Sequence, residues 1–284
     1  SPVPGMGTAC GGGDGRGGAL RCRGIQPAAH RRGGVMDKAL IRRRFSKAAA
    51  TYAERADVQR EIARRMARLV RTYVPVSERK KVVEVGCGTG TFTRDFLRHE
   101  RPERMWLNDL CPEMEVPLKD VLRENVSFLP GDAETVDFPD GQDLFVSCSA
   151  IQWFEHPEEF FVKCHARLRE GGYWAFSTFG PRNMEEVAAL TSATLPYRSQ
   201  AELRRELERN YRVLYSREDL IRLTFASPME VLKHLKETGV TGIGSRTWTR
   251  QSLSEFCRRY EQRYPSPEGG VLLTYHPIYM IAKK

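Results

Sequence analysis

The sequence predicts an α/β fold, a doubly wound and mostly parallel sheet of seven strands. Three observations predict it. Between residues 81 and 179, short β-rich runs alternate with helical stretches, the pattern of parallel strands joined by crossover helices. A glycine-rich turn joins the first of these runs to the helix after it, as in doubly wound folds that bind a ligand at the carboxyl ends of their strands. Two later β-rich stretches, 211–225 and 272–282, complete the seven strands.

The composition is that of a globular protein. Of 284 residues, 40% are hydrophobic and 29% charged, and no run approaches the ~18–20 apolar residues that a membrane span requires. An integral membrane protein is therefore excluded. The 7 cysteines include no C-x-x-C pair, so neither a zinc ribbon nor a disulfide framework is indicated and no metal is expected. We expect a reducing compartment, the cytoplasm.

Residues 1–35 form a Gly/Arg-rich tail. The tail contains 11 of the 24 glycines and almost no large apolar side chain, so we expect it to be disordered. It carries +4 of the net charge of +9. The remaining chain is only mildly basic, which fits an acidic protein partner or an anionic substrate as well as nucleic acid. We expect Met36 to be the natural start and the tail to be added sequence.

Residues 36–75 are predicted to form a helical lid. Apolar side chains recur there at three- and four-residue spacing, at Val58, Ile62, Met66, Leu69, Val70 and Tyr73. Arginines at 60, 64, 68 and 71 line another helix face, which we expect to be solvated.

Residues 80–180 are predicted to form the core of the sheet. The expected strands are Lys81–Val85, Met105–Asn108, Val126–Leu129, Leu144–Cys148 and Tyr173–Phe179. The expected helices are Gly90–His99, Met114–Arg123 and one that Pro157 opens and Gly171 follows.

The remaining chain is predicted to add a helical insertion over residues 181–210, after the fifth strand, and then closing strands and helices over 211–284. Tyr211–Phe225 favours a strand, although Ser216-Arg-Glu-Asp could cap a helix. A capping box at Ser227 predicts a helix that runs to Gly239. A second helix over about 250–263 precedes a closing strand, Leu272–Ala282.

The turn after the first strand has the spacing E-x-G-x-G-x-G, formed by Glu84, Gly86, Gly88 and Gly90. A dinucleotide fingerprint would place its third glycine at position 91, which is threonine. The turn resembles the glycine loop of class I S-adenosylmethionine-dependent methyltransferases. Glycines let the backbone approach the methionine end of the cofactor, and the helix amino terminus favours its carboxylate. The resemblance implies that Glu84 helps hold the amino group, through backbone or water. Alone, the turn could merely pack strand on helix.

Two more acids follow the next strands. Asp109 ends the second strand, 19 residues after Gly90, where a carboxylate accepts both ribose hydroxyls. The neighbouring Asn108 could share this role. In the methyltransferases that the turn resembles, the acid after the third strand accepts from the adenine amino group; here Asp132 and Ala133 follow that strand. Together with the glycine loop, these residues predict S-adenosyl-L-methionine as the cofactor.

The segment after the fourth strand, residues 147–154, lies beside the expected position of the transferred methyl group. It lacks the D/N-P-P-Y/F motif of amino-group methylases, which argues against nucleobase amino methylation.

Several motifs at both ends of the chain resemble a narrower family, the biotin-pathway malonyl-acyl-carrier-protein O-methyltransferases. They are the R-F-x-x-A-A-x-x-Y opening at 44–52, Ala56–Gln59, the Gln152-Trp153 pair, residues 235–241 and the Thr-Tyr-His ending at 274–276. The resemblance spans residues 36–284.

The resemblance implies methylation of the free carboxylate of malonyl-acyl carrier protein, or of malonyl-CoA, to give the methyl ester for pimeloyl and biotin biosynthesis. A carboxylate has a pKa near ~4 and is already the nucleophile at pH 7, so no general base is required. The enzyme needs placement of the reacting groups and exclusion of water.

The candidate donors to the substrate carboxylate are Tyr52, Tyr275 and His276, with Trp153 as a wall of the substrate site. Gln152 could contact substrate or core. Tyr52 could equally be a core contact of an amphipathic helix, and the other two donors could belong to a closing strand. The implied partner, acyl carrier protein, is acidic. We expect it to dock on Arg42, Arg43 and Arg44, with the stripe at 60, 64, 68 and 71 as the second choice.

Two alternatives stay open. One is a class I methyltransferase acting on a free small molecule, such as a quinone or a dicarboxylic acid. The other is an RNA-associated, non-catalytic methyltransferase-like subunit, which the intact cofactor motif disfavours. We expect neither nucleic acid nor membrane as a partner, and a monomer, although the sequence does not fix the oligomeric state.

Overall fold

The computed structural model describes residues 37–55, 57–238 and 247–284, without the side chains of residues 47–55. The tail expected over 1–35 and the end of the predicted helix at Gly239 lie outside the described residues. So do residues 239–241 of the quoted motif 235–241.

The main sheet has seven strands in the order β3-β2-β1-β4-β5-β9-β6. Strands β1 to β5 pair in parallel, and β9 runs antiparallel to both β5 and β6. This confirms the predicted α/β class. The strands are β1 (Lys81–Val85), β2 (Arg104–Asp109), β3 (Val126–Pro130), β4 (Gln142–Cys148), β5 (Leu168–Phe179), β6 (Arg212–Glu218) and β9 (Pro277–Lys283).

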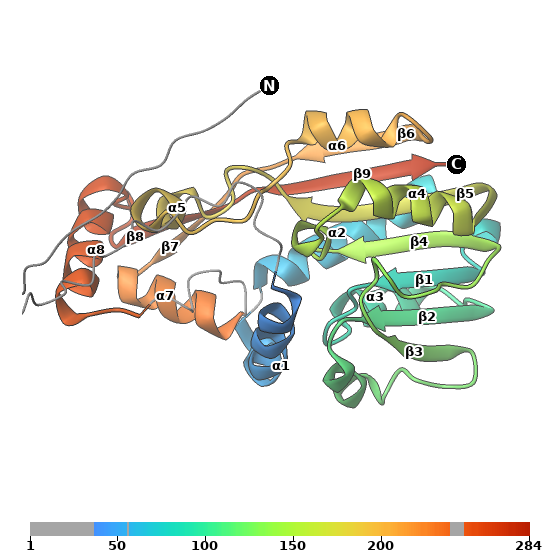
Figure 1. Ribbon diagram of the computed structural model, residues 1–284, viewed down its shortest axis with the longest axis horizontal. Coiled ribbons are helices and arrows are strands. Elements are labelled where there is room, and N and C mark those ends of the chain that lie inside the picture. Colours follow the sequence, from blue (N-terminus) through green and yellow to red (C-terminus); the bar gives the residue numbers. More distant parts are fainter. Residues whose placement is uncertain (1–36, 56, 239–246) are drawn as a thin grey trace, which may run out of the picture. The chain divides into compact units, whose positions relative to one another are not determined.

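Helices cover the main sheet on both faces (Figure 1). Side chains of α2 (Asp57–Tyr73) and α3 (Thr91–His99) share one hydrophobic core with the sheet. Those of α4 (Pro157–Arg167) and α6 (Gln200–Leu207) share the other. Successive strand residues point to opposite faces, so Val82 lies in the first core and Val83 in the second. The central strands therefore carry apolar residues on both faces.

A second, two-stranded sheet was not predicted. It pairs β7 (Ile221–Phe225) with β8 (Val271–Tyr275) in antiparallel fashion, beside α5 (Glu185–Thr191), α7 (Pro228–Glu237) and α8 (Arg250–Arg263). The two long strands expected late in the chain are thus each two strands. The first breaks between Glu218 and Ile221, and the second breaks at His276. The two helices of the predicted insertion pack in different places. Helix α5 contacts β8 and α8, beside the small sheet, whereas α6 contacts β6 of the main sheet.

Two predicted helix boundaries were wrong. Instead of a helix over Met114–Arg123, the chain forms a 3-10 helix, η2 (Pro112–Leu118), which contains Pro117. Proline has no N–H to donate, so it does not support an α-helical ladder there. Helix α4 ends at Arg167, and Gly171 lies inside β5 with φ +77°. Further short 3-10 helices are η1 (Val76–Glu78) and η3 (Ile151–Trp153).

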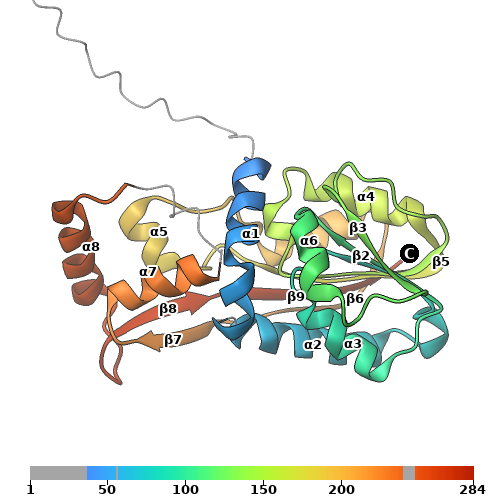
Figure 2. The same cartoon turned by 90° about the horizontal axis from the view of Figure 1, so that it is seen from below.

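The segment predicted as a lid consists of two different helices. Helix α2 is a core helix, because Ile62, Met66 and Val70 are fully buried. Helix α1 (Lys38–Arg55) contacts η2 and α7 and crosses the carboxyl ends of the strands (Figure 2). Only α1 therefore lies where a lid would be. The arginine stripe of α2 is solvated in part, as expected, since Arg64 pairs at the surface with Glu61.

No helix within residues 37–55, 57–238 and 247–284 is long and apolar enough to cross a bilayer.

Candidate active site

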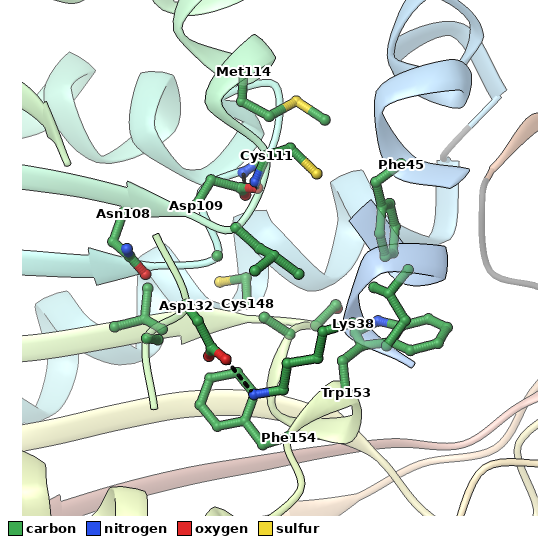
Figure 3. A pocket seen from close by; sticks show the side chains of 18 of the residues that line it. Lys38, Phe45, Asn108, Asp109, Cys111, Met114, Asp132, Cys148, Trp153 and Phe154 are labelled. Atoms are coloured by element: carbon green, nitrogen blue, oxygen red, sulfur yellow. Dashed lines mark hydrogen bonds and ion pairs between the residues drawn. The ribbon is translucent and has the colours of Figure 1, made fainter. Parts of the chain in front are cut away.

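A cavity lies at the carboxyl ends of β1, β2, β3 and β4, with α1 on its open side (Figure 3). Its walls come from the four loops that follow these strands and from one face of α1. The lining residues are Lys38, Ile41, Phe45, Val85, Gly86, Gly88, Thr89, Asn108, Asp109, Leu110, Cys111, Met114, Asp132, Ala133, Cys148, Ser149, Ala150, Trp153 and Phe154.

The glycine loop forms the floor of this cavity. Gly86 has φ +68°, and a Cβ atom there would lie 2.4 Å from the Cβ of Ala150, so the loops after β1 and β4 touch. Gly88 has φ +52°, and a Cβ atom there would meet no atom within 4 Å. Only glycine adopts this left-handed conformation without strain, and it leaves backbone groups facing the cavity.

Asp109 presents a carboxylate at the end of β2. One oxygen accepts the N–H of Gly88 at 2.8 Å and the other accepts the N–H of Cys111 at 2.9 Å. Burial raises the pKa of Asp109 above its ordinary value, although these two backbone hydrogen bonds lower it. Each carboxylate oxygen can accept more than one hydrogen bond. Two fixed acceptors beside a backbone-lined floor therefore fit the two hydroxyls of a ribose.

Glu84 lies behind the glycine loop and is not among the described residues that line the cavity. Its carboxylate accepts the hydroxyl of Thr93 at 2.6 Å, which ties β1 to α3. Burial raises the pKa of Glu84 to about 8, and the Thr93 hydrogen bond only partly offsets this. Any effect of Glu84 on a cofactor amino group would pass through the loop backbone. Asn108 is also a structural tie, because its amide donates to the carbonyls of Leu129 and Gly131.

A lysine that the sequence analysis missed reaches the end of β3. Lys38 of α1 pairs with Asp132 at 2.6 Å and also with Glu134. Burial lowers the pKa of Lys38, but hydrogen bonds and charges from the two acids outweigh burial and raise it. The other oxygen of Asp132 accepts the N–H of Glu134 at 3.0 Å. The sequence signal that could have found Lys38 is its spacing from Ile41 and Phe45, which places all three residues on the helix face that lines the cavity.

Further contacts tie α1 to the opposite side of the cavity. Glu113 of η2 accepts hydrogen bonds from Arg42 at 3.2 Å and from Ser46 at 3.1 Å. The thiol of Cys111 donates to the Arg42 carbonyl at 3.4 Å. Helix α1 therefore bridges the loops after β2 and β3.

Trp153 and Gln152, which follow β4, have different surroundings. Trp153 lines the cavity, and its ring meets that of Phe45 edge-on, with centroids 5.4 Å apart. The Gln152 amide donates to the Ser149 carbonyl at 2.7 Å and accepts from the Thr178 hydroxyl at 3.2 Å. The structure thus places Trp153 at the cavity wall and holds Gln152 against backbone behind it.

Two of the three predicted carboxylate donors have hydrogen-bond partners within the described residues. Tyr52 belongs to α1, but its side chain lies outside what the structure describes. Tyr275 is fully buried in β8, with its hydroxyl 2.8 Å from Nε2 of His234. His276 accepts the N–H of Arg182 at Nδ1, at 3.1 Å, and contacts Glu218 through Nε2 at 2.8 Å.

Tyr275 and His276 are not among the described residues that line the cavity. Their placement follows from the chain crossing between sheets at His276, which strand periodicity does not reveal. The structure therefore shows each of these side chains paired with a protein group, Tyr275 with His234 and His276 with Glu218 and the Arg182 N–H, and the substrate role stays a prediction.

The arginine cluster on α1 is partly available to a partner. Arg42 and Arg43 are exposed, whereas Arg44 is half-buried. Burial, and then the neighbouring Arg43 charge, lower the pKa of Arg44. The solvent-facing part of the predicted docking cluster is thus Arg42 and Arg43.

Comparisons with known proteins agree with this geometry. Residues 83–176 match the family model described as a methyltransferase domain. The YcgJ protein of Bacillus subtilis shares the fold, with a TM-score of 0.56 at 16% identity over 77% of this chain and 97% of that one.

Curated relatives are much more similar in sequence. A malonyl-[acyl-carrier protein] O-methyltransferase of Bacteroides thetaiotaomicron is 52% identical over 88% of this chain and 99% of its own length. One of Haemophilus influenzae is 35% identical over 87% and 95%, respectively. One of Bacteroides fragilis is 53% identical over 87% of this chain, which spans 50% of that protein's length. The chain therefore belongs to the malonyl-[acyl-carrier protein] O-methyltransferase family.

Proposed function

We propose that this protein transfers a methyl group from S-adenosylmethionine to the free carboxylate of a malonyl group carried by acyl carrier protein. The relatives named for this reaction match nearly the whole described chain, at up to 53% identity. The observation that carries the proposal is the cavity, which joins an Asp109 carboxylate, a bare glycine floor and an aromatic wall. The product, a malonyl methyl ester, would serve pimeloyl and biotin synthesis.

Each part of the cavity has a proposed task toward the cofactor. Asp109 would accept the ribose hydroxyls, and Asp132 with Ala133 would face the adenine. Gly86, Gly88 and Gly90 would admit the methionine end beside the amino terminus of α3, where the helix dipole favours a carboxylate. Glu84 would support this loop from behind, through Thr93.

The chemistry requires little from ionisable side chains. S-adenosylmethionine supplies a methyl group bonded to a sulfonium; a malonyl oxygen forms the new C–O bond as the C–S bond breaks, and no proton is transferred. The residues therefore have to place the carboxylate in line and exclude water. Phe45 and Trp153, whose rings meet edge-on, would form an apolar wall for this purpose.

Helix α1 and its arginines would cover the site and attract the partner. Helix α1 would close over both ligands as a lid and bring Tyr52 toward the acceptor. Arg42 and Arg43 would attract the acidic carrier protein. In this proposal residues 36–284 form one methyltransferase domain, which acts as a monomer.

Methyl transfer from labelled S-adenosylmethionine tests the proposal, with malonyl-acyl carrier protein, malonyl-CoA and free malonate as parallel acceptors. We expect label on the malonyl carboxylate, most strongly on the carrier form, and its loss on ester hydrolysis. Cofactor binding without transfer to any malonyl compound would contradict the proposal and favour a different small-molecule acceptor.

A further inference from the structure

Gln59 of α2 is a buried amide without a partner. Its side chain is only 6% exposed, and neither Oε1 nor Nε2 has a hydrogen-bond partner. In the part of the chain that the structure describes, it is the one buried amide side chain with both polar atoms unpaired. Leaving a buried amide unpaired is destabilising, and such a group calls for an explanation, for example a ligand that pairs with it.

The direction of α2 places Gln59 at the active-site edge of the sheet. The helix ends at Tyr73, close to the start of β1 at Lys81, and Arg79 just before β1 donates to the carbonyls of Arg71 and Val74. The carboxyl end of α2 therefore lies at the amino edge of the parallel strands. At about 1.5 Å per residue the helix spans the sheet, so its first turn lies at the carboxyl edge.

Gln59 also lies on the correct face of the helix. It precedes Ile62 by three residues and Met66 by seven, so all three side chains share the sheet-facing side. Ile62 and Met66 belong to the hydrophobic core against which Cys148 packs, and Cys148 lines the cavity at the end of β4. Gln59 is not itself among the described residues that line the cavity. Its place in the first turn of α2 puts it on the face of the sheet from which Cys148 reaches the cavity.

We propose that the Gln59 amide binds the acceptor carboxylate, with its N–H donating to a carboxylate oxygen. This inference rests on the proposed function. An amide is neutral, so it orients a carboxylate while stabilising its negative charge less than a lysine or arginine would. Less ground-state stabilisation leaves the oxygen more nucleophilic.

The test is Gln59→Leu in the full chain, with three readouts: thermal unfolding, S-adenosylhomocysteine binding, and transfer to malonyl-acyl carrier protein. Because Leu removes an unpaired amide of similar size, we expect Tm to stay level or rise. Binding of S-adenosylhomocysteine should not change. We expect kcat/KM for malonyl-acyl carrier protein to fall at least about tenfold.

The matched control is Gln142→Leu. Gln142 is also buried and leaves its Oε1 unpaired, but it begins β4 at the opposite edge of the sheet. This variant should keep its kcat/KM. A second test variant, Gln59→Glu, has a side chain of similar shape that carries a negative charge. It should reduce transfer further by repelling the substrate carboxylate.

A structural role for Gln59 predicts the opposite pattern, in which Tm, cofactor-product binding and transfer fall together; this would overturn the inference. If the unmodified chain methylates malonyl-acyl carrier protein and both Gln59 variants do so equally well, the inference about Gln59 is overturned while the proposed function stands. If the unmodified chain binds S-adenosylhomocysteine but does not methylate that acceptor, the proposed function fails and this inference fails with it.

Discussion

Two buried acids next to the glycine loop have different tasks. Asp109 faces the cavity and is held by two backbone N–H groups, whereas Glu84 faces α3 and accepts the Thr93 hydroxyl. Burial raises the pKa of both groups. Sequence spacing predicts that both acids lie near the cofactor, and the structure shows that Asp109, but not Glu84, lines the cavity.

Glu84 should make the protein less stable as pH rises. Its pKa is about 8 in the folded state against an ordinary 4.5, so the folded chain binds more protons between these values. Stability contributed by this proton is therefore lost as pH rises from about 4.5 to 8. Glu84→Gln removes this effect, and its stability relative to the unmodified protein should increase by at most about 4 kcal/mol between pH 5 and pH 8.

Urea unfolding at several pH values measures this difference. Thr93→Val is the control, since it removes the hydrogen bond but keeps the acid, and should retain the pH dependence. Parallel pH profiles for Glu84→Gln and the unmodified chain would show that Glu84 is ionised throughout.

Asp109→Asn should weaken binding of S-adenosylhomocysteine by about tenfold or more. The amide replaces one acceptor oxygen with an NH₂ group that opposes a backbone N–H of Gly88 or Cys111. Titration calorimetry measures the affinity. Asp137→Asn is the control, because Asp137 is exposed and pairs with Arg167; equal affinities for the two variants would remove Asp109 from the cofactor site.

Helix α1 shows how an element far from the glycine loop in sequence completes the site. Its 38/41/45 face lines the cavity, and its ion pairs reach the loops after β2 and β3. The sequence predicts the helix but not these partners, because ion pairs between segments about 70 and 95 residues apart leave no local pattern. Lys38 could not be distinguished from any surface lysine.

We predict that Lys38→Met weakens S-adenosylhomocysteine binding about tenfold, because α1 loses its tie to Asp132 and Glu134. Bound S-adenosylhomocysteine should protect the 42–44 arginines from trypsin in the unmodified chain and protect them less in the variant. Lys38→Arg should restore most of the affinity, and the exposed Lys119→Met should behave as unmodified. Tighter binding by Lys38→Met would mean instead that the lysine competes with the adenine for Asp132.

The break between β8 and β9 explains why strand prediction failed there. Apolar and β-branched residues continue on both sides of the break within residues 272–282. At His276, however, the chain passes from one sheet to the other, and this side chain is held by Glu218 and the Arg182 N–H. In contrast, β1 to β5 were placed within a few residues, because buried parallel strands have uninterrupted apolar runs.

His276→Ala should therefore lower the free energy of unfolding by about 2 kcal/mol and leave S-adenosylhomocysteine binding intact. Urea denaturation and calorimetry give the two values. A variant of normal stability that no longer methylates malonyl-acyl carrier protein would instead return His276 to the role of a substrate donor.

At the scale of the whole molecule, the sequence indicated a mildly basic body and an acidic partner. The described surface carries many arginines, but most sit beside acids, as Arg167 does with Asp137 and Asp140. Net charge alone therefore could not locate a docking surface. The exposed Arg42 and Arg43 stand out because they lie on the helix that covers the cavity.

Reversing both charges, in Arg42→Glu/Arg43→Glu, should raise KM for malonyl-acyl carrier protein several-fold at low salt, and less at high salt. The control is Arg205→Glu/Arg209→Glu, which reverses two exposed arginines in and just after α6. Affinity for S-adenosylhomocysteine should be measured alongside, since Arg42 also pairs with Glu113. An unchanged KM would exclude these arginines as a docking surface.

The contact between Gly86 and Ala150 has a consequence for how the enzyme can evolve. A Cβ atom added at Gly86 would lie only 2.4 Å from the Cβ of Ala150. The loop after β1, which would hold the methyl donor, is therefore packed directly against the loop after β4, which would lie beside the acceptor. Neither can shift toward the other, so the spacing between the two reactants is inherited from main-chain geometry. New acceptors would then be accommodated by changing side chains and the covering helix, while the reacting distance stays fixed.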